Sequence, residues 1–179
     1  MSTVNVIDKP QTANRGGKYL TFALGSEEYG LEILKVREII GYMEITAVPH
    51  TPSYVRGVIN LRGQVISVID LRARFGMATA EKTEQTCIIV VEITCDGRRV
   101  NIGIVVDRVS EVINIPAASI EDAPSFGVEI DTSFILGMGK IGTNVKLLLD
   151  IDRVLSRQEL SHVTGAPDRG DKDEMPAAA

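Results

Sequence analysis

The sequence contains no tryptophan, only two histidines and only two cysteines, and this scarcity removes several classes of chemistry. Cys87 and Cys95 are separated by a predicted turn, at a spacing that matches neither a redox C-x-x-C motif nor a zinc ribbon. His50 lies in a proline-rich loop and His162 in a polar tail, so neither is well placed for a catalytic triad or a metal site. We therefore expect no metal and no cofactor.

Familiar catalytic and nucleotide-binding motifs are also missing. The sequence has no G-x-S-x-G elbow, no Walker A loop and no H-E-x-x-H motif. A G-x-G-x-x-G run at 137–142 precedes a predicted strand at 145–149, whereas a dinucleotide site needs a helix there. Asp70, Asp150 and Asp152 stand where helix N-caps are expected, rather than as paired catalytic acids. We predict that the protein has no catalytic residues and is not an enzyme.

Long apolar runs and an excess of positive charge are absent as well. No run approaches the ~18 apolar residues of a membrane-spanning helix, and the N-terminus lacks the apolar core of a signal peptide. The net charge of −5 disfavours nucleic-acid binding, which usually needs a basic face. A hydrophobic content of 44% is typical of a globular protein. We expect a cytoplasmic protein without direct membrane insertion or a nucleic-acid partner.

The most informative stretch is VRGVINLRGQVISVIDL at residues 55–71. Two runs rich in β-branched residues flank Arg62-Gly63, which predicts a buried β-hairpin with its turn at this dipeptide. Gly57 and Gly63 supply backbone freedom at the start of the hairpin and at its turn. Arg62 either caps neighbouring carbonyls or faces a partner. Asp70 is a good N-cap for a short helix at 71–75.

The same pattern returns 80 residues later, where residues 135–155 align without a gap on residues 55–75. A second alignment, at an offset of 73, places residues 103–113 on residues 30–40. Agreement at glycine, aspartate and glutamate positions indicates a duplication into two similar units. Two copies are too few for a solenoid, which needs about three repeats. Because such small units bury little surface alone, we expect them to pack against each other and share a groove.

Local patterns predict the remaining elements. We expect strands at 19–24, 29–33, 39–40, 87–93, 100–106, 109–115, 134–137, 140–142 and 145–149. Short helical segments are expected at 34–38, 54–56 and 118–122, with a final helix from Asp150 or Asp152 to about residue 160. The polar stretch 76–86 is the predicted boundary between the units. Domain limits are a disordered arm at 1–17, one domain at 18–160 with subdomains at about 18–82 and 86–156, and a disordered tail at 161–179.

The charged residues beside the hairpin allow two interpretations. In one, Glu38 and Arg62 form a surface ion pair, which typically contributes under ~1 kcal/mol. In the other, these charges border an apolar groove between the units that accepts a partner helix. Val36 lies beside them, and Val109 and Glu111 are the counterparts in the second unit. The pattern alone favours neither interpretation.

In combination, these motifs resemble the CheW family of bacterial chemotaxis coupling proteins. The resemblance covers about residues 18–160 and rests on E-Y-G at 28–30, L-K-V-R-E-I at 34–39, V-R-G-V-I-N-L-R-G at 55–63, V-I-D-L at 68–71, G-I-V-V-D at 103–107 and L-G at 136–137. It implies a mainly β fold of two intertwined five-stranded SH3-like barrels, with short helices and a C-terminal helix.

The resemblance also implies a function. Proteins of this family are non-enzymatic scaffolds that couple the cytoplasmic tips of methyl-accepting chemoreceptors to the histidine kinase CheA. They bind its regulatory domain, which shares their fold, and they form array rings with it and with further CheW copies. Matched by motif, the receptor contacts would be Val36, Glu38, Ile39, Gly57, Arg62 and Val109. The kinase contacts would be Glu121 and Phe126, although some members are basic at the position of Glu121.

Two alternative functions are considered. One is a CheW-like adaptor of a different two-component pathway, such as one for motility or surface sensing. The other is a small-ligand-binding barrel, which the lack of aromatic residues at strand centres disfavours. A receiver-fused adaptor or the kinase itself would need further domains, which we do not find in this sequence.

Overall fold

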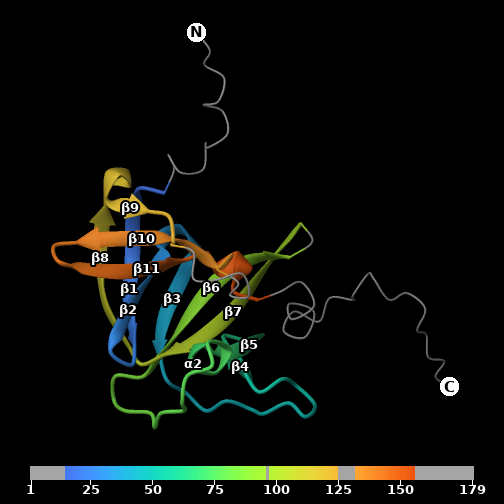
Figure 1. The fold of residues 1–179 in the computed structure, drawn as a ribbon. Coiled ribbons are helices and arrows are strands. Elements are labelled where there is room, and N and C mark those ends of the chain that lie inside the picture. Colours follow the sequence, from blue (N-terminus) through green and yellow to red (C-terminus); the bar gives the residue numbers. More distant parts are fainter. Residues whose placement is uncertain (1–14, 96, 125–131, 156–179) are drawn as a thin grey trace.

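The computed structural model describes residues 15–95, 97–124 and 132–155. The chain forms two mostly antiparallel sheets that lie against each other (Figure 1). The strands of sheet A are, in spatial order, β8 (Arg108–Ile115), β1 (Gly17–Leu24), β2 (Glu27–Glu32), β11 (Asn144–Leu149), β10 (Ile135–Ile141) and β9 (Ile120–Glu121). Those of sheet B are β3 (Val36–Gly41), β6 (Cys87–Cys95), β7 (Arg98–Val106), β5 (Gln64–Asp70) and β4 (Val55–Leu61). The mainly β prediction is therefore confirmed, with the two-residue strand β9 as an addition.

The helical segments within the described residues are short. They are the 3-10 turns η2 (Ile33–Lys35), η3 (Ala117–Ser119) and η4 (Ile151–Arg153) and the helix α2 (Leu71–Arg74). Asp70 caps α2 as predicted, because its side chain accepts hydrogen bonds from the backbone N–H groups of Arg72 and Ala73. The predicted helix at 54–56 is wrong, since β4 already begins at Val55. Of the predicted C-terminal helix only the turn η4 falls within the described residues, which end at 155.

Each sheet combines strands from both halves of the chain. In sheet A, the β1–β2 hairpin pairs with β8 on one side and, in parallel, with β11 on the other. In sheet B, the β6–β7 hairpin pairs with β3 and, again in parallel, with β5. Apart from β9, the strands of sheet A therefore correspond in order to those of sheet B, and β4 and β10 begin 80 residues apart, as the sequence offset predicts. This exchange is the intertwined arrangement that the resemblance implies.

In the part of the chain that the structure describes, buried apolar side chains form three clusters. The largest lies between the sheets, because its members come from both, including Phe22 and Leu31 of sheet A and Ile89 and Ile104 of sheet B. A smaller cluster belongs to sheet B alone, around Ile59, Ile66, Val68, Ile88, Val90 and Val105. A third belongs to sheet A, with Tyr19, Ile115, Ile120 and Leu148. Strand β6 thus buries both of its faces, as its nearly continuous apolar sequence predicts.

Candidate functional site

The β4–β5 hairpin ends in the two-residue turn that its sequence predicts. Leu61 pairs with Gln64, and the enclosed Arg62 and Gly63 have φ angles of 55° and 85°. Two positive φ angles are characteristic of a type I′ turn, which matches the twist of a hairpin. For a residue with a side chain, the left-handed region costs about 1–2 kcal/mol. The tip is exposed rather than buried, since Val65 is 68% exposed.

Arg62 meets Glu38 of β3 in a bidentate ion pair. Its Nη1 donates to Glu38 Oε1 at 2.6 Å, and its Nη2 donates to Oε2 at 3.0 Å. This hydrogen bonding lowers the pKa of the Glu38 carboxyl and raises the pKa of the Arg62 guanidinium. Strands β3 and β4 lie at opposite edges of sheet B, so the pair joins the two edges. The predicted ion pair is therefore present, and its guanidinium plane is fixed at the surface.

Gly57 lies where the backbone of another segment approaches β4 closely. Its φ angle is 142°, and a Cβ atom at this position would lie 2.0 Å from the carbonyl oxygen of Thr46. Thr46 and Val58 exchange two backbone hydrogen bonds, each of 2.9 Å. Only glycine fits here without moving the segment around Thr46, so Gly57 fixes the backbone beside the hairpin.

The apolar members of the predicted receptor surface lie on both sheets. Ile39 of β3 is 45% exposed. Val36 of β3 and Val109 of β8 are half-buried, and both pack against the core between the sheets. Val109 also makes a backbone hydrogen bond to the thiol of Cys87, which begins β6 of sheet B. The structure thus places five of the six predicted residues on sheet B and the sixth, Val109, on the neighbouring edge of sheet A.

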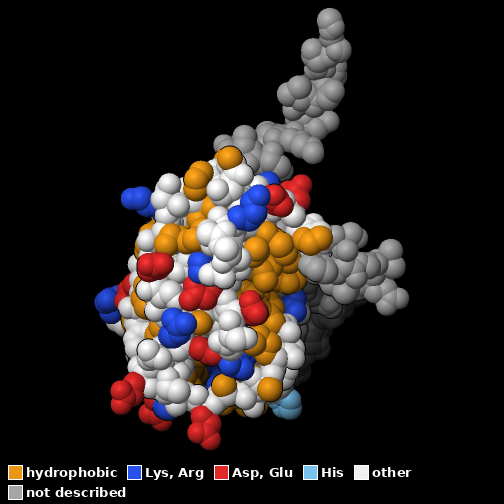
Figure 2. Space-filling view, turned by 60° about the vertical axis from the view of Figure 1, so that its left-hand side comes forward, with side chains coloured by type: hydrophobic (Ala, Val, Ile, Leu, Met, Phe, Trp, Pro, Cys, Tyr) orange, Lys and Arg blue, Asp and Glu red, His pale blue; other side chains and the backbone are white. Residues whose placement is uncertain are grey.

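Of the two predicted kinase contacts, Glu121 lies on a different part of the molecule. Glu121 belongs to β9 at the edge of sheet A, where its Oε2 atom lies 2.6 Å from Nζ of Lys140. Both side chains are at least half exposed. Phe126 lies outside the described residues. On the face shown in Figure 2, basic and acidic side chains are interspersed, and hydrophobic side chains gather in a strip along one side.

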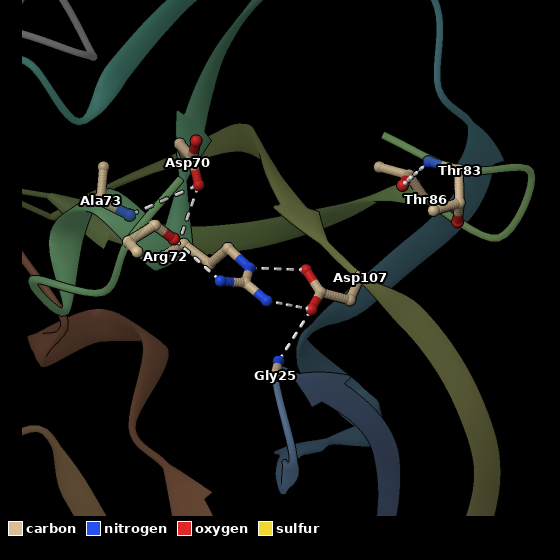
Figure 3. Close-up of polar contacts among 8 residues, drawn as sticks. Gly25, Asp70, Arg72, Ala73, Thr83, Thr86 and Asp107 are labelled. Atoms are coloured by element: carbon tan, nitrogen blue, oxygen red, sulfur yellow. Dashed lines mark hydrogen bonds and ion pairs between the residues drawn. The ribbon is translucent and has the colours of Figure 1, made fainter. Parts of the chain in front are cut away.

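A polar contact that no sequence pattern predicted lies between Arg72 and Asp107, at the point where the chain passes from one sheet to the other (Figure 3). Arg72 Nε donates to Asp107 Oδ1 at 2.9 Å, and Arg72 Nη2 donates to Oδ2 at 2.7 Å. The same Oδ2 atom accepts a hydrogen bond of 2.7 Å from the backbone N–H of Gly25. The hydrogen bonds from Arg72 lower the pKa of the Asp107 carboxyl. The two residues are 35 positions apart in the sequence, so no local pattern indicates that they meet.

An apolar cavity of about 450 Å³ lies beside the segment that follows α2. Its lining includes the aromatic rings of Tyr29, Phe75 and Phe134. The centroids of Tyr29 and Phe75 are 5.8 Å apart, and those of Phe75 and Phe134 are 5.3 Å apart. Within the described residues, no three His, Cys, Asp or Glu side chains are grouped to hold a metal ion, and no helix is long and apolar enough to span a membrane.

Comparisons with known proteins agree with this fold. A family model described as CheW-like domain matches residues 18–159. The chemotaxis protein CheW of Klebsiella aerogenes is 40% identical over 163 residues, which cover 91% of this chain and 96% of that protein. The chemotaxis protein CheW of Bacillus subtilis is 34% identical over 155 residues, covering 86% and 95%. The crystal structure of the scaffolding protein TtCheW from Thermoanaerobacter tengcongensis has a TM-score of 0.70 at 38% identity, covering 80% of this chain and 97% of that one.

These matches agree with one another and with the strand order described above. The family match covers both sheets, from the first strand of sheet A to the segment beyond η4. The family consists of scaffold proteins and not of enzymes, as the missing catalytic motifs predict. The chain belongs to the CheW family of chemotaxis scaffold proteins.

Proposed function

We propose that this protein is a cytoplasmic scaffold that couples the tips of chemoreceptors to the regulatory domain of the histidine kinase CheA. Family membership supports the general role. The observation that carries the specific role is the conformation of Arg62, an exposed arginine held in a left-handed turn and aligned by Glu38. Glycine would adopt this turn conformation with less backbone strain. The presence of arginine therefore suggests that its side chain has a function that offsets the strain.

The receptor surface combines apolar contact with a fixed charge pair. Ile39 offers an exposed aliphatic anchor, while the half-buried Val36 and Val109 provide an apolar floor for a helix laid between the sheets. Glu38 holds the Arg62 guanidinium in place before the partner arrives, so less side-chain entropy is lost on binding. The receptor helix then meets both signs of charge in a fixed order, which favours one orientation over the other.

The kinase surface lies at the edge of sheet A, away from the Arg62 turn. Glu121 and Lys140 mark this edge, and Phe126 follows Glu121 closely in the sequence. We assign the main apolar anchor to Phe126, because aromatic side chains often dominate protein interfaces. Two separate surfaces let one molecule hold the receptor and the kinase at the same time. Further copies of the chain would extend such contacts into rings.

Charge reversal at the turn tests the receptor assignment. Arg62→Glu places two carboxylates together, so binding of a receptor-tip fragment should weaken by about tenfold or more. Binding of the CheA regulatory domain should stay unchanged. Lys140→Glu is the matched control, because it reverses another exposed, ion-paired cation, and it should leave receptor binding intact. Both affinities are measured by titration calorimetry. A folded Arg62→Glu protein with wild-type receptor affinity would contradict the assignment.

The complementary variant is Phe126→Ala. It should weaken binding of the regulatory domain while sparing the receptor fragment. An equal loss of both affinities would indicate misfolding and not a kinase contact.

Coupling itself is tested by sedimentation with receptor-bearing membranes. The protein should enter the pellet, and kinase activity in the pellet should rise only when receptor, scaffold and CheA are all present. If the protein stays in the supernatant both with and without CheA, the proposed function is wrong even though the fold is right.

A further inference from the structure

Asp107 is the single residue at which the chain passes from sheet B to sheet A. Strand β7 ends in sheet B at Val106, and β8 begins in sheet A at Arg108. The backbone N–H of Asp107 donates to the carbonyl oxygen of Ala23 at 3.1 Å, and its carboxylate accepts the hydrogen bond from Gly25. Both partners belong to the β1–β2 hairpin or its turn. Asp107 is thus anchored to sheet A on one side.

Arg72 anchors the same carboxylate to sheet B. It lies in α2, directly after β5, and its backbone N–H is held by Asp70 at 3.0 Å. Its Nη1 atom donates to the carbonyl oxygen of Ala78 at 2.8 Å, which leaves Nε and Nη2 aimed at Asp107 (Figure 3). The side chains of Arg72 and Asp107 are 18% and 31% exposed, so water screens the pair only partly. Both ends of the link are therefore fixed by their own hydrogen bonds.

The second crossover has the same link with the charges exchanged. The chain passes from β2 in sheet A to β3 in sheet B through η2, and Lys35 of η2 lies 2.6 Å from Asp152 of η4. Asp152 also accepts a hydrogen bond of 2.9 Å from the backbone N–H of Thr94, at the end of β6. In both places, a helical segment that follows a hairpin forms an ion pair with a residue of the crossover between the sheets. An ion pair is therefore present at both crossovers, although the positions of the cation and the anion are exchanged. What the two halves of the chain share is the link and not the charge of either residue.

We propose that Arg72 and Asp107 are positioning residues for the receptor surface. Val109 follows Asp107 by two positions and is the member of that surface that sheet A contributes. The other members, including Glu38 and Arg62, lie on sheet B. The link sets where β8 lies against sheet B and so fixes Val109 relative to the charged pair. This inference rests on the receptor-binding function proposed above.

Asp107→Asn is the sharpest variant, because it removes the charge while keeping an oxygen for the N–H of Gly25. Receptor-fragment affinity should fall about tenfold, a coupling effect of ordinary size, with regulatory-domain affinity unchanged in the same folded sample. Arg72→Met should have the same effect, and the double variant should be no worse than either single one. Arg72→Lys, which keeps the charge but not the fork, should recover part of the affinity.

Lys146→Met is the matched control. It breaks the partly buried ion pair between Lys146 of β11 and Glu28 of β2, which lies within sheet A and does not join the sheets. Receptor affinity should therefore stay at the wild-type value. The inference is overturned if Asp107→Asn and Arg72→Met keep full receptor affinity, if both affinities fall in parallel, or if Lys146→Met loses as much as they do.

A second readout does not depend on the receptor. Residual dipolar couplings of the free protein report the relative orientation of the two sheets. The couplings of the wild type and of Lys146→Met should fit the same relative orientation of the two sheets. Those of Asp107→Asn should fit a different orientation, or an average over several orientations. Unchanged orientation in Asp107→Asn would overturn the inference. Absence of receptor binding by the wild type would instead contradict the proposed function, and a changed orientation in the variant would still show that the link positions β8.

Discussion

The β4–β5 and β10–β11 hairpins derive from one sequence pattern, and they differ at their turns. Each encloses two residues, between Leu61 and Gln64 in one and between Ile141 and Asn144 in the other. The second turn, Gly142-Thr143, has a positive φ only at its glycine, as in a type II′ turn. The first places Arg62 in that region instead. The second turn thus has glycine at its left-handed position, whereas the first has an arginine there at a cost in backbone strain.

Local contacts offset part of that cost in the β4–β5 turn. Asn60 Oδ1 accepts a hydrogen bond of 2.8 Å from the N–H of Gly63, and Glu38 holds the Arg62 side chain. Lys140, the counterpart of Asn60, instead pairs with Glu121 outside the hairpin. The strained turn therefore has its own supporting hydrogen bond, whereas the glycine turn needs none.

The largest difference between the hairpins is expected at their paired glycines. Gly57→Ala should lower the free energy of unfolding by about 3 kcal/mol or more, because the new Cβ meets backbone at a positive φ. Gly137→Ala should cost about 1–2 kcal/mol, since its nearest obstacle is a methyl group of Ile120, 2.6 Å away. Urea denaturation measures both values. Equal losses would contradict the close approach at Gly57.

A smaller effect is expected from Gly142→Ala, which introduces the same kind of backbone strain into the second turn. At a φ of 61° the substitution should cost about 1–2 kcal/mol. No heavy atom lies within 4 Å of the added Cβ, so the loss reports backbone conformation alone. Denaturation again provides the measurement, and a neutral substitution would mean that the two turns do not differ in strain.

Arg62→Gly reverses the comparison by giving the first turn a glycine. Release of the left-handed strain should leave stability unchanged or raise it by up to about 1 kcal/mol, since the exposed ion pair contributes little. Receptor-fragment affinity should nevertheless fall about tenfold, because the recognised side chain is gone. Parallel denaturation and calorimetry separate the two effects. Loss of stability together with affinity would mean that Arg62 serves the fold.

The smallest effect concerns acid. Arg62 lowers the folded-state pKa of Glu38, so the ion pair stabilises the fold above the unfolded pKa of about 4.3 and this contribution is lost as the pH falls through the folded value. The stability difference between wild type and Glu38→Gln should therefore be greatest near neutral pH and disappear on acidification. Denaturation curves at a series of pH values test this. A difference that grows in acid would have the wrong sign.

Local sequence patterns predicted where the strands lie in the sequence better than they predicted which strands pair with each other. The 55–71 pattern gave the hairpin and its turn because β-branched runs and a glycine act through adjacent residues. The pairing of Tyr29 with Leu147 joins distant parts of the chain, and only the internal repeat hinted at it. The predicted helix at 54–56 failed because the carbonyl of Tyr54 accepts a hydrogen bond from the N–H of Asp70, which draws this stretch to the sheet.

The candidate site was predictable to a similar extent. Glu38 and Arg62 were matched because their motif is compact and unusual, and the structure brings their side chains together. Arg72 and Asp107 were missed because a cation and an acid 35 residues apart carry no local mark of contact. Such a link becomes visible only when the two sheets are placed against each other.

The exchange of strands bears on how such a chain could arise and be divided. Strands β3 and β5 flank the β6–β7 hairpin, so an N-terminal fragment that ends within residues 76–86 lacks the central hairpin of sheet B. In sheet A, the same fragment keeps the β1–β2 hairpin but lacks β8 and β11, the strands that pair with it on either side. The two fragments should fold only when mixed. A single ancestral half would likewise have needed a second copy of itself, in a strand-swapped homodimer. Within one chain the two copies can differ, as they do at the hairpin turns, where Arg62 in one copy corresponds to Gly142 in the other.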